Sequence, residues 1–170
     1  MQRIGKVLHA ARFFIVAGVI FAAGIVIFWP AHPDSTAGAG VEALLKEGAD
    51  AEAGGRLPEA AGIYEKALGL APDLEAVYLK LGLVYFRSGL ASKAEDVYLK
   101  AVGRGFKDPD LFMYLGYIRE ARGDLDQALA YYAKAELAGS RNPGLYFNAG
   151  NICARQGRND KALEYFKRAV

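Results

Sequence analysis

The chain alternates apolar and polar positions in pairs of short segments, and the clearest pair lies between residues 74 and 102. Apolar residues recur there every three or four positions, which is the spacing of one face of an α-helix. They are Leu74, Val77, Tyr78, Leu81, Val84 and Tyr85 in the first segment, and Ala94, Val97, Tyr98, Ala101 and Val102 in the second. Gly89 separates the segments and suits the positive φ of a turn that ends a helix. The pattern predicts two amphipathic helices joined by a tight turn.

The same pattern returns every 34 residues, and five series of residues keep this step over four copies. They are Gly48, Gly82, Gly116 and Gly150; Gly55, Gly89, Gly123 and Gly157; Ala60, Ala94, Ala128 and Ala162; Ala67, Ala101, Ala135 and Ala169; and Tyr64, Tyr98, Tyr132 and Phe166. A fixed period of this length is typical of a solenoid, in which each unit buries its apolar face against its neighbours. A plain helical bundle is the alternative, but a bundle needs no fixed period.

The second copy reads Tyr78-x-x-Leu81-Gly82-x-x-Tyr85, followed by Ala94-x-x-x-Tyr98. This motif resembles the tetratricopeptide repeat, with Tyr78 at the position where that family usually has tryptophan. The resemblance covers residues 41–170 and implies an all-α fold, a right-handed α-solenoid of tandem helix-turn-helix repeats. The repeats would be residues 41–74, 75–108, 109–142 and 143–170, the last of them truncated. Several residues depart from the family pattern, namely Glu47, Ala51, Phe106, Arg119, Ser140, Ala149 and Cys153.

Helix starts and close helix contacts are also indicated. Asp108-Pro109 and Asn142-Pro143 each place an N-capping side chain before a proline suited to the first helical position. Gly82 is small where two helices have to approach closely, and neighbouring aromatic rings are expected to fill the remaining space.

Residues 1–40 differ in character from the repeats. Residues 1–12 form a basic tail with Arg3, Lys6 and Arg12, and residues 13–29 carry no charge. As a helix, residues 13–29 would extend over about 25 Å, close to the ~30 Å hydrocarbon layer of a bilayer. Trp29 at the far end suits a membrane interface. We therefore predict one N-terminal transmembrane helix over residues 13–29, which serves as a signal-anchor.

Positive charge precedes the apolar segment, and no lysine or arginine follows it before Lys46. This asymmetry predicts a cytoplasmic amino terminus, with the repeats outside the cytoplasm on the other side of the cell (inner) membrane. A cleaved signal peptide is the alternative, with a small-residue site at Ala37-Gly38-Ala39. Residues 30–40 are rich in proline, glycine, serine and alanine and are predicted to be a flexible linker.

The chemistry of the repeats argues against several classes of function. Residues 41–170 carry 18 basic and 18 acidic residues, whereas a nucleic-acid surface needs clustered positive charge. Both histidines, His9 and His32, precede the repeats, so no catalytic Ser-His or Cys-His pair is expected in them. The sequence shows neither a phosphate-binding loop nor the ligand spacing of a zinc site. We expect no enzymatic activity, cofactor or metal, and Cys153 falls on a buried helical stripe.

The family resemblance implies a protein-binding surface. In tetratricopeptide repeat proteins, the first helix of each repeat lines a concave groove that takes up a partner peptide or helix. The matching residues here are Leu45, Leu79, Leu83, Phe86, Arg87, Met113, Tyr117, Glu120, Phe147, Asn148, Asn151 and Arg155. Leu79, Leu83 and Phe86 share a helical stripe separate from that of Tyr78 and Leu81, which supports the assignment. The alternative is that these residues are additional core beneath neighbouring repeats.

Some members of the family grip the C-terminal carboxylate of heat-shock chaperones through a Lys/Asn/Arg clamp. The matching residues here are Leu45, Ala49, Lys80, Asp110 and Tyr114. Only Lys80 is basic, and Asp110 would repel a carboxylate, so this activity is not expected. Asn148 and Asn151 instead offer amide groups to an extended peptide backbone.

These features favour a membrane-tethered protein–protein interaction scaffold or adaptor, and the resemblance implies an envelope assembly, secretion or biogenesis complex as its setting. The alternative is a periplasmic holdase-like chaperone whose groove takes unfolded apolar segments. Because solenoid ends need a polar face, we expect Leu163, Phe166 and Val170 in the last helix to be partly uncovered. Either the natural protein continues beyond them, or another chain covers them.

Overall fold

The computed structural model of the chain describes residues 16–22, 25–30 and 34–170. The chain divides into two units, residues 1–43 and 44–170, and each is described by itself. The predicted basic tail of residues 1–12 and His32 lie outside the described residues.

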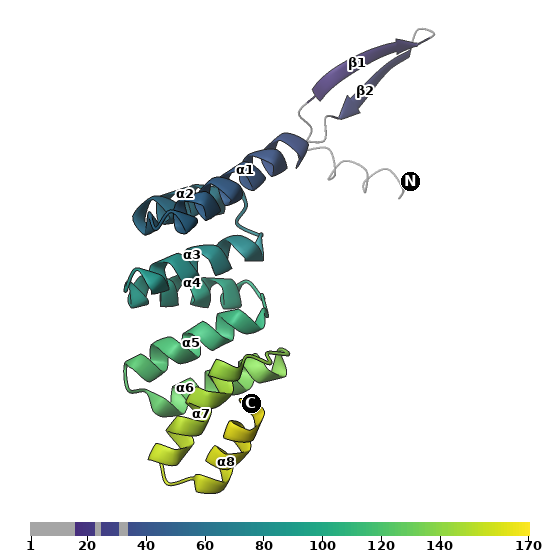
Figure 1. Ribbon diagram of the computed structural model, residues 1–170. Coiled ribbons are helices and arrows are strands. Elements are labelled where there is room, and N and C mark those ends of the chain that lie inside the picture. The colour runs from purple at the N-terminus through teal and green to yellow at the C-terminus, as the bar shows by residue number, and fades with distance from the viewer. Residues whose placement is uncertain (1–15, 23–24, 31–33) are drawn as a thin grey trace, which may run out of the picture. The chain divides into compact units, whose positions relative to one another are not determined.

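Strands β1 (Val16–Ala22) and β2 (Ile25–Pro30) form a two-stranded antiparallel hairpin, drawn in purple in Figure 1. Val19 lies opposite Phe28 in its register. The transmembrane helix predicted for residues 13–29 is therefore wrong for the described part of that segment. Valine, isoleucine and phenylalanine dominate it, and β-branched and aromatic residues favour extended backbone, while Gly18 weakens a helix. None of the described helices combines the length and apolarity needed to cross a bilayer.

Helix α1 (Asp34–Ala53) begins inside the segment predicted to be a linker. The linker prediction for residues 30–40 is therefore wrong from Asp34 onward. No proline lies between Pro33 and Pro58, and alanine, present at Ala37 and Ala39, has the highest helix propensity of any residue type. The first repeat consequently begins with a longer helix than the others.

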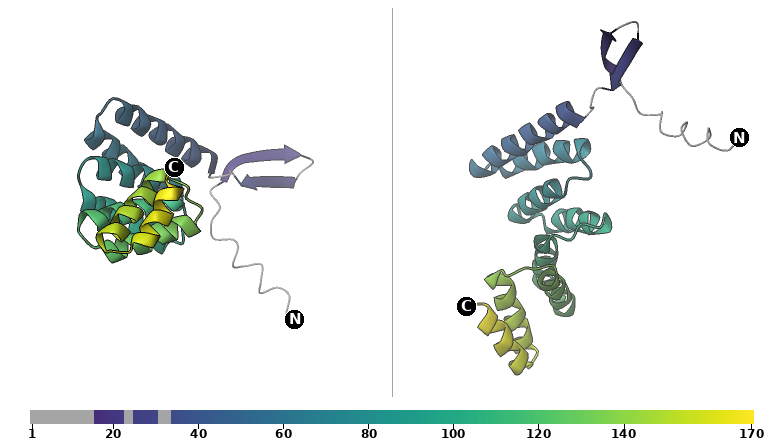
Figure 2. Two further views of the ribbon diagram at one scale, coloured as in Figure 1. Left: turned by 60° about the horizontal axis from the view of Figure 1, so that its bottom comes forward. Right: turned by 90° about the vertical axis from the view of Figure 1, so that its right-hand side faces the viewer.

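The remaining chain consists of helices that stack pair upon pair, from teal to yellow in Figure 1 and in both views of Figure 2. They are α2 (Leu57–Leu70), α3 (Glu75–Arg87), α4 (Ala91–Gly103), α5 (Pro109–Ala121), α6 (Leu125–Leu137), α7 (Pro143–Arg155) and α8 (Asn159–Arg168). Each helix from α2 to α7 contacts the helix that follows it in the chain. The predicted all-α solenoid of helix-turn-helix repeats is confirmed for residues 44–170.

Each repeat closes around an aromatic ring that packs on a glycine. A Cβ atom added to Gly82 would lie 2.3 Å from the ring of Tyr98, so only glycine lets α3 and α4 approach this closely. Tyr98 is fully buried as a result. The corresponding contacts in the other repeats are Gly48 with Tyr64, Gly116 with Tyr132, and Gly150 with Phe166. The close approach predicted at Gly82 is confirmed.

The turns and helix starts follow the sequence signals. Gly89 has a φ of 74° in the turn between α3 and α4, a conformation that residues with a Cβ rarely adopt. The Asp108 side chain accepts a hydrogen bond from the backbone N–H of Asp110 at 2.8 Å, and Asn142 accepts one from Gly144 at 2.8 Å. The predicted glycine turn and both predicted N-caps are confirmed.

Two tyrosines anchor their repeats to the preceding turn. The Tyr78 hydroxyl donates to the carbonyl of Pro72 at 2.9 Å, and the Tyr146 hydroxyl donates to the carbonyl of Ser140 at 2.9 Å. Tyrosine thus adds a hydrogen bond at the position where the family usually has tryptophan.

Cys153 of α7 is buried, as expected.

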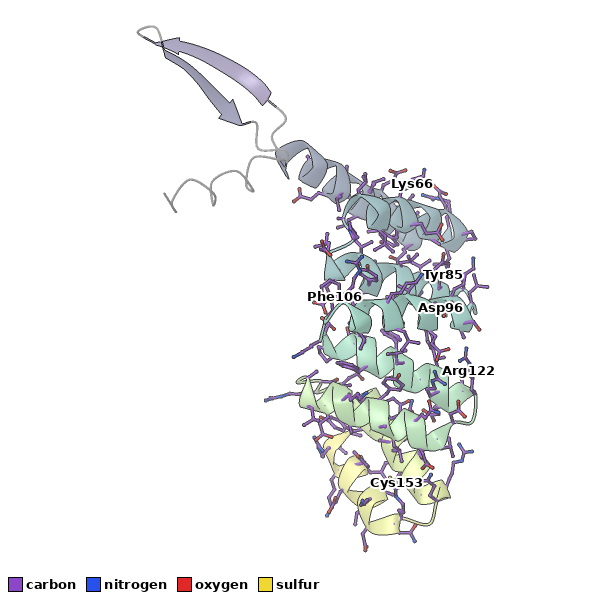
Figure 3. All side chains as sticks on the ribbon, turned by 180° about the vertical axis from the view of Figure 1, so that it is seen from behind. Lys66, Tyr85, Asp96, Phe106, Arg122 and Cys153 are labelled. Atoms are coloured by element: carbon purple, nitrogen blue, oxygen red, sulfur yellow. The ribbon has the colours of Figure 1, made fainter. Side chains whose placement is uncertain are left out.

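The junction between the second and third repeats contains buried charge. Arg119 of α5 and Arg122, which directly follows that helix, both form ion pairs with Glu95 of α4, which is buried. Arg122 lies on the same side of the stack as Tyr85, and Figure 3 labels both residues. Arg119 therefore replaces an aromatic residue of the family without leaving its charge unpaired.

Candidate partner-binding groove

The first helices of the repeats carry the side chains predicted to line a groove, and most of these side chains are partly or fully accessible. Leu45, Leu79, Leu83, Phe86, Tyr117, Glu120, Asn148 and Asn151 are half-buried, and Arg87, Phe147 and Arg155 are exposed. Partial burial is expected for a surface that is anchored in the core and still available to a ligand.

Met113 is an exception, and its assignment to the groove is wrong. Its side chain is only 4% exposed and belongs to the core cluster that includes Leu145 and Ile152 of α7. Phe147, which is 34 residues further on, is 54% exposed. The following repeat covers Met113, whereas Phe147 lies on the last described helix pair. The same repeat position is therefore core in one copy and surface in another.

A pocket of about 490 Å³ lies where α3, α5 and α7 face one another, and we call it the groove pocket. Its walls are Phe86, Tyr117, Glu120, Ala121, Asn148 and Arg155. The structure thus brings together five of the predicted groove residues, from three different repeats. Ala121 was missed, although it is equivalent by the 34-residue step to Arg87 and Arg155, and that step could have found it.

Aromatic rings form the floor of the groove. The ring of Phe86 lies 5.4 Å from that of Tyr114 and 6.4 Å from that of Tyr117, measured between centroids. Tyr114 in turn stacks on the buried Tyr98 at 5.6 Å, and Tyr117 meets Tyr132 edge-on at 5.7 Å. The groove rings are therefore held from below by the core rings, which gives the surface a fixed shape.

Hydrogen bonds from core tyrosines reach carboxylates on the groove side. The Tyr64 hydroxyl donates to Glu52 at 2.7 Å, and the Tyr132 hydroxyl donates to Glu120 at 2.6 Å. Burial, followed by these hydrogen bonds, raises the pKa of Tyr64 and of Tyr132 above the usual range of tyrosine. Both hydroxyls consequently remain protonated donors at neutral pH.

Two further charged features lie on the first helices of the repeats, an ion pair of Arg87 and the carboxyl group of Asp110. Arg87 forms an ion pair with Glu52 at 3.1 Å, which neutralises charge beside the first two repeats. Asp110 has its pKa raised, mainly by burial and then by the nearby Asp108.

Within the part of the chain that the structure describes, no group of three or more His, Cys, Asp or Glu side chains is arranged to hold a metal ion.

The end of the solenoid presents apolar surface, as expected. Leu163 and Val170 are exposed and Phe166 is half-buried. The Phe147 ring lies 5.9 Å from that of Phe166. This apolar surface adjoins the fourth repeat's contribution to the groove.

A family model of the tetratricopeptide repeat matches residues 45–110 and 113–170. The match includes every residue of the groove pocket. No curated protein sequence matches the chain significantly.

Solved structures of MamA are similar to the chain. One MamA crystal structure has a TM-score of 0.69 at 26% identity and covers 76% of this chain and 75% of that chain. A second has a TM-score of 0.67 at 25% identity and covers 80% and 74%. A MamA fragment from Desulfovibrio magneticus RS-1, at 19% identity, has a TM-score of 0.66 over 76% and 73% of the two chains and shows the fold alone.

Proposed function

The chain belongs to the tetratricopeptide repeat family, and on this premise we propose that it is a scaffold or adaptor that binds a segment of a partner protein in the groove of α3, α5 and α7. Repeats of this family form protein–protein interaction modules, and their members generally act by binding rather than by catalysis. The partner is a protein or peptide, and no cofactor takes part.

The groove pocket is the observation that carries this proposal. It combines the accessible rings of Phe86 and Tyr117 with the polar side chains of Glu120, Asn148 and Arg155. Ligand sites typically pair an apolar wall with a few polar groups that fix orientation. Tyrosine and arginine are also the residues that most often dominate binding energy at protein interfaces.

The proposal includes attachment to the cell (inner) membrane through residues 13–29, with the amino terminus in the cytoplasm and the repeats outside it. The segment has no charged residue, and Arg3, Lys6 and Arg12 precede it, which supports this orientation. An antiparallel hairpin returns the chain to the side from which it starts, so this orientation requires residues 13–29 to cross the bilayer once as a continuous segment and not as the β1–β2 hairpin. A scaffold tethered in this way suits an envelope assembly, secretion or biogenesis complex.

Site-specific photo-crosslinking tests the groove. The photoreactive residue p-benzoylphenylalanine replaces Phe147, which is an exposed aromatic side chain of the groove outside the groove pocket. The control position is Leu137 on α6, which is 88% exposed. We expect one or two discrete adducts from position 147 and none from position 137. Equal labelling from both positions, or none from position 147, would overturn the groove as the binding surface.

The same experiment separates the scaffold from the second candidate function, a periplasmic holdase-like chaperone. The exposed apolar side chains of Phe147 and Leu163 are the observation that favours this candidate. A chaperone would give adducts with many unrelated proteins and would suppress their aggregation in vitro. A scaffold would do neither.

Fractionation and proteolysis test the membrane attachment. We expect the full chain to stay in the membrane pellet after a carbonate wash, and protease added outside sealed spheroplasts to digest the repeats. Protection of the repeats would reverse the orientation. A soluble product that begins near Gly40 would show a cleaved signal peptide instead.

A further inference from the structure

One tyrosine of the solenoid lacks the partner that its equivalents have. One position of the repeat, at the 34-residue step, is occupied by Glu52, Phe86, Glu120 and Ala154. Glu52 accepts a hydrogen bond from the Tyr64 hydroxyl, and Glu120 accepts one from the Tyr132 hydroxyl. The fourth repeat has Ala154 at this position, and its core ring is Phe166, which has no hydroxyl and needs no acceptor. Only the second repeat is mismatched, because Phe86 stands where Tyr98 would need an acceptor.

The mismatch leaves the Tyr98 hydroxyl buried with no hydrogen-bond partner among the described residues. A buried hydroxyl without a partner destabilises a fold, because its desolvation is not compensated. A glutamate at position 86 would remove this penalty, as it does in the first and third repeats. Natural proteins accept such local penalties mainly at functional sites. Phe86 packs on Tyr114 and Tyr117 but leaves the Tyr98 hydroxyl without an acceptor among the described residues, which points to a role of this ring beyond stability.

The ring of Phe86 forms one wall of the groove pocket, opposite side chains of α5 and α7. The volume of about 490 Å³ falls within the range of ligand pockets, about 300–1,000 Å³. A glutamate at this position would put a charge where the pocket now has an apolar surface. Phe86 is thus both the residue that departs from the repeat pattern and the residue that forms the apolar wall.

A second comparison between repeats concerns the polar walls. Glu52 and Arg87, from the first and second repeats, form an ion pair at 3.1 Å. Their equivalents by the same step are Glu120 and Arg155. Both line the groove pocket, but they form no ion pair with each other among the described side chains. Glu52 and Arg87 are thus paired with each other, whereas Glu120 and Arg155 are not paired with each other among the described side chains and both line the groove pocket.

Charge restricts what fits between Glu120 and Arg155. A cationic side chain would be attracted by Glu120 and repelled by Arg155, and an anionic one would meet the reverse. An uncharged amide satisfies both, because its N–H donates to the carboxylate and its carbonyl accepts from the guanidinium. An α-helical ligand uses its main-chain amides internally, so a main-chain amide that can bind both side chains comes from an extended segment.

We propose that the groove pocket is the specificity subsite of the groove. It receives one uncharged apolar side chain of an extended partner segment against Phe86 and Tyr117, while the adjoining main-chain amide lies between Glu120 and Arg155. This assignment rests on the proposed function and names the chemistry of the partner segment.

Blocked tripeptides with glycine on either side of a variable central residue are the probes. Binding is followed by NMR shifts of the Asn148 and Arg155 side-chain signals in the full chain. We expect dissociation constants on the order of 0.1–1 mM for central phenylalanine or leucine, and binding at least about tenfold weaker for central lysine, glutamate or alanine. Strongest binding of the lysine or glutamate probe, or shifts that leave both side chains unchanged, would overturn the subsite.

The variant Phe86→Glu tests both the missing acceptor of Tyr98 and the apolar wall of the groove pocket. Phe86→Ala loses the same ring contacts with Tyr114 and Tyr117 without giving Tyr98 an acceptor. We therefore expect Phe86→Glu to melt at a higher temperature than Phe86→Ala and to weaken the phenylalanine probe at least about tenfold. Leu137→Glu places the same charge at an exposed site away from the groove and should change neither quantity. A melting temperature for Phe86→Glu no higher than that of Phe86→Ala would contradict the first comparison. Phe86→Leu, which keeps the wall apolar, then still tests the pocket and should retain binding.

Arg155→Gln tests the place of the amide between Glu120 and Arg155 and should weaken the phenylalanine probe at least about fivefold. Arg56→Gln makes the same change in an exposed ion pair of α2 and should have no effect on binding. Crosslinking from position 147 does not depend on the groove pocket. If adducts form there while the probes fail, the subsite is wrong and the scaffold stands; if the probes bind and no adduct forms, the reverse holds.

Discussion

Arg119 of α5 and Glu95 of α4 form an ion pair across the junction between the second and third repeats. One junction earlier, Tyr85 occupies the position of Arg119, and its hydroxyl donates to Glu65 of α2. In both cases a side chain of the first helix reaches back to a carboxylate of the preceding repeat. The solenoid therefore closes successive junctions with different chemistry at one position.

Glu95→Ala should lower the free energy of unfolding by about 2–4 kcal/mol. Loss of one partner of a buried ion pair typically costs about 3–5 kcal/mol, because the other charge is left uncompensated. The loss is somewhat smaller here, since Arg119 also lies 3.5 Å from Asp124 and is 21% exposed. Denaturation by urea, followed by circular dichroism, measures the change.

Two variants serve as controls for this ion pair. Glu95→Leu combined with Arg119→Tyr replaces the two most buried charges by apolar contact. Arg122 also loses its pair with Glu95, but it is 37% exposed and keeps its hydrogen bond to Ser92, so the double change should cost less than about 1 kcal/mol. Glu59→Ala breaks the exposed pair with Arg56 and should change stability by less than about 0.5 kcal/mol. If Glu95→Ala costs no more than Glu59→Ala, burial of the pair has no energetic consequence.

Gly82→Ala should destabilise the protein by about 1–3 kcal/mol, the usual range for overpacking a core. The added Cβ would collide with the Tyr98 ring, and the ring has no free space to move into, because it is fully buried. Gly62→Ala in α2 is the matched control, since a Cβ there has no neighbour within 4 Å. It should stabilise the helix by about 0.5–1 kcal/mol. Equal effects at the two glycines would refute the packing argument.

The 34-residue step made most of the repeat fold predictable, because each landmark residue has one structural role that recurs. The residues expected in the groove came from the family resemblance, and Phe86, Tyr117, Glu120, Asn148 and Arg155 of that set line one pocket. The resemblance failed at Met113, because burial depends on what the next repeat places above a position and not on the position itself. The pattern within one helix does not contain that information.

Other features were beyond the sequence for different reasons. The segment containing β1 and β2 is a continuous apolar run, and periodicity alone cannot separate a strand from a helix in such a run. The pairing of Arg119 with Glu95 depends on which side chains meet across a junction. That the Tyr98 hydroxyl has no partner among the residues described becomes evident only when equivalent hydrogen bonds are compared between repeats.

Stability should fall as the pH rises above about 10. Burial, and then the hydrogen bond to Glu65, raises the pKa of Tyr85 to about 12, whereas an unfolded tyrosine has a pKa of about 10. The native state therefore holds a proton that the unfolded state releases, so this contribution is complete below pH ~10 and is lost as the pH rises toward ~12. Urea denaturation between neutral and alkaline pH measures the decline, and Tyr85→Phe should make it shallower. Tyrosinate absorbance of the native protein that appears in full near pH ~10 would contradict the raised pKa values.

Removal of single tyrosine hydroxyls should have opposite effects in different repeats. Tyr64→Phe and Tyr132→Phe each delete a hydrogen bond to a glutamate, and each should lower the free energy of unfolding by about 1–2 kcal/mol. Tyr98→Phe deletes a hydroxyl that is buried without a partner among the described residues and keeps the ring on Gly82. It should therefore be neutral or stabilise the protein by up to about 1 kcal/mol. Guanidinium denaturation of the three variants under identical conditions gives the comparison, provided that the m-value is unchanged. A loss for Tyr98→Phe equal to that of the other two would mean that its hydroxyl is hydrogen-bonded in solution, and Phe86 would then carry no stability penalty.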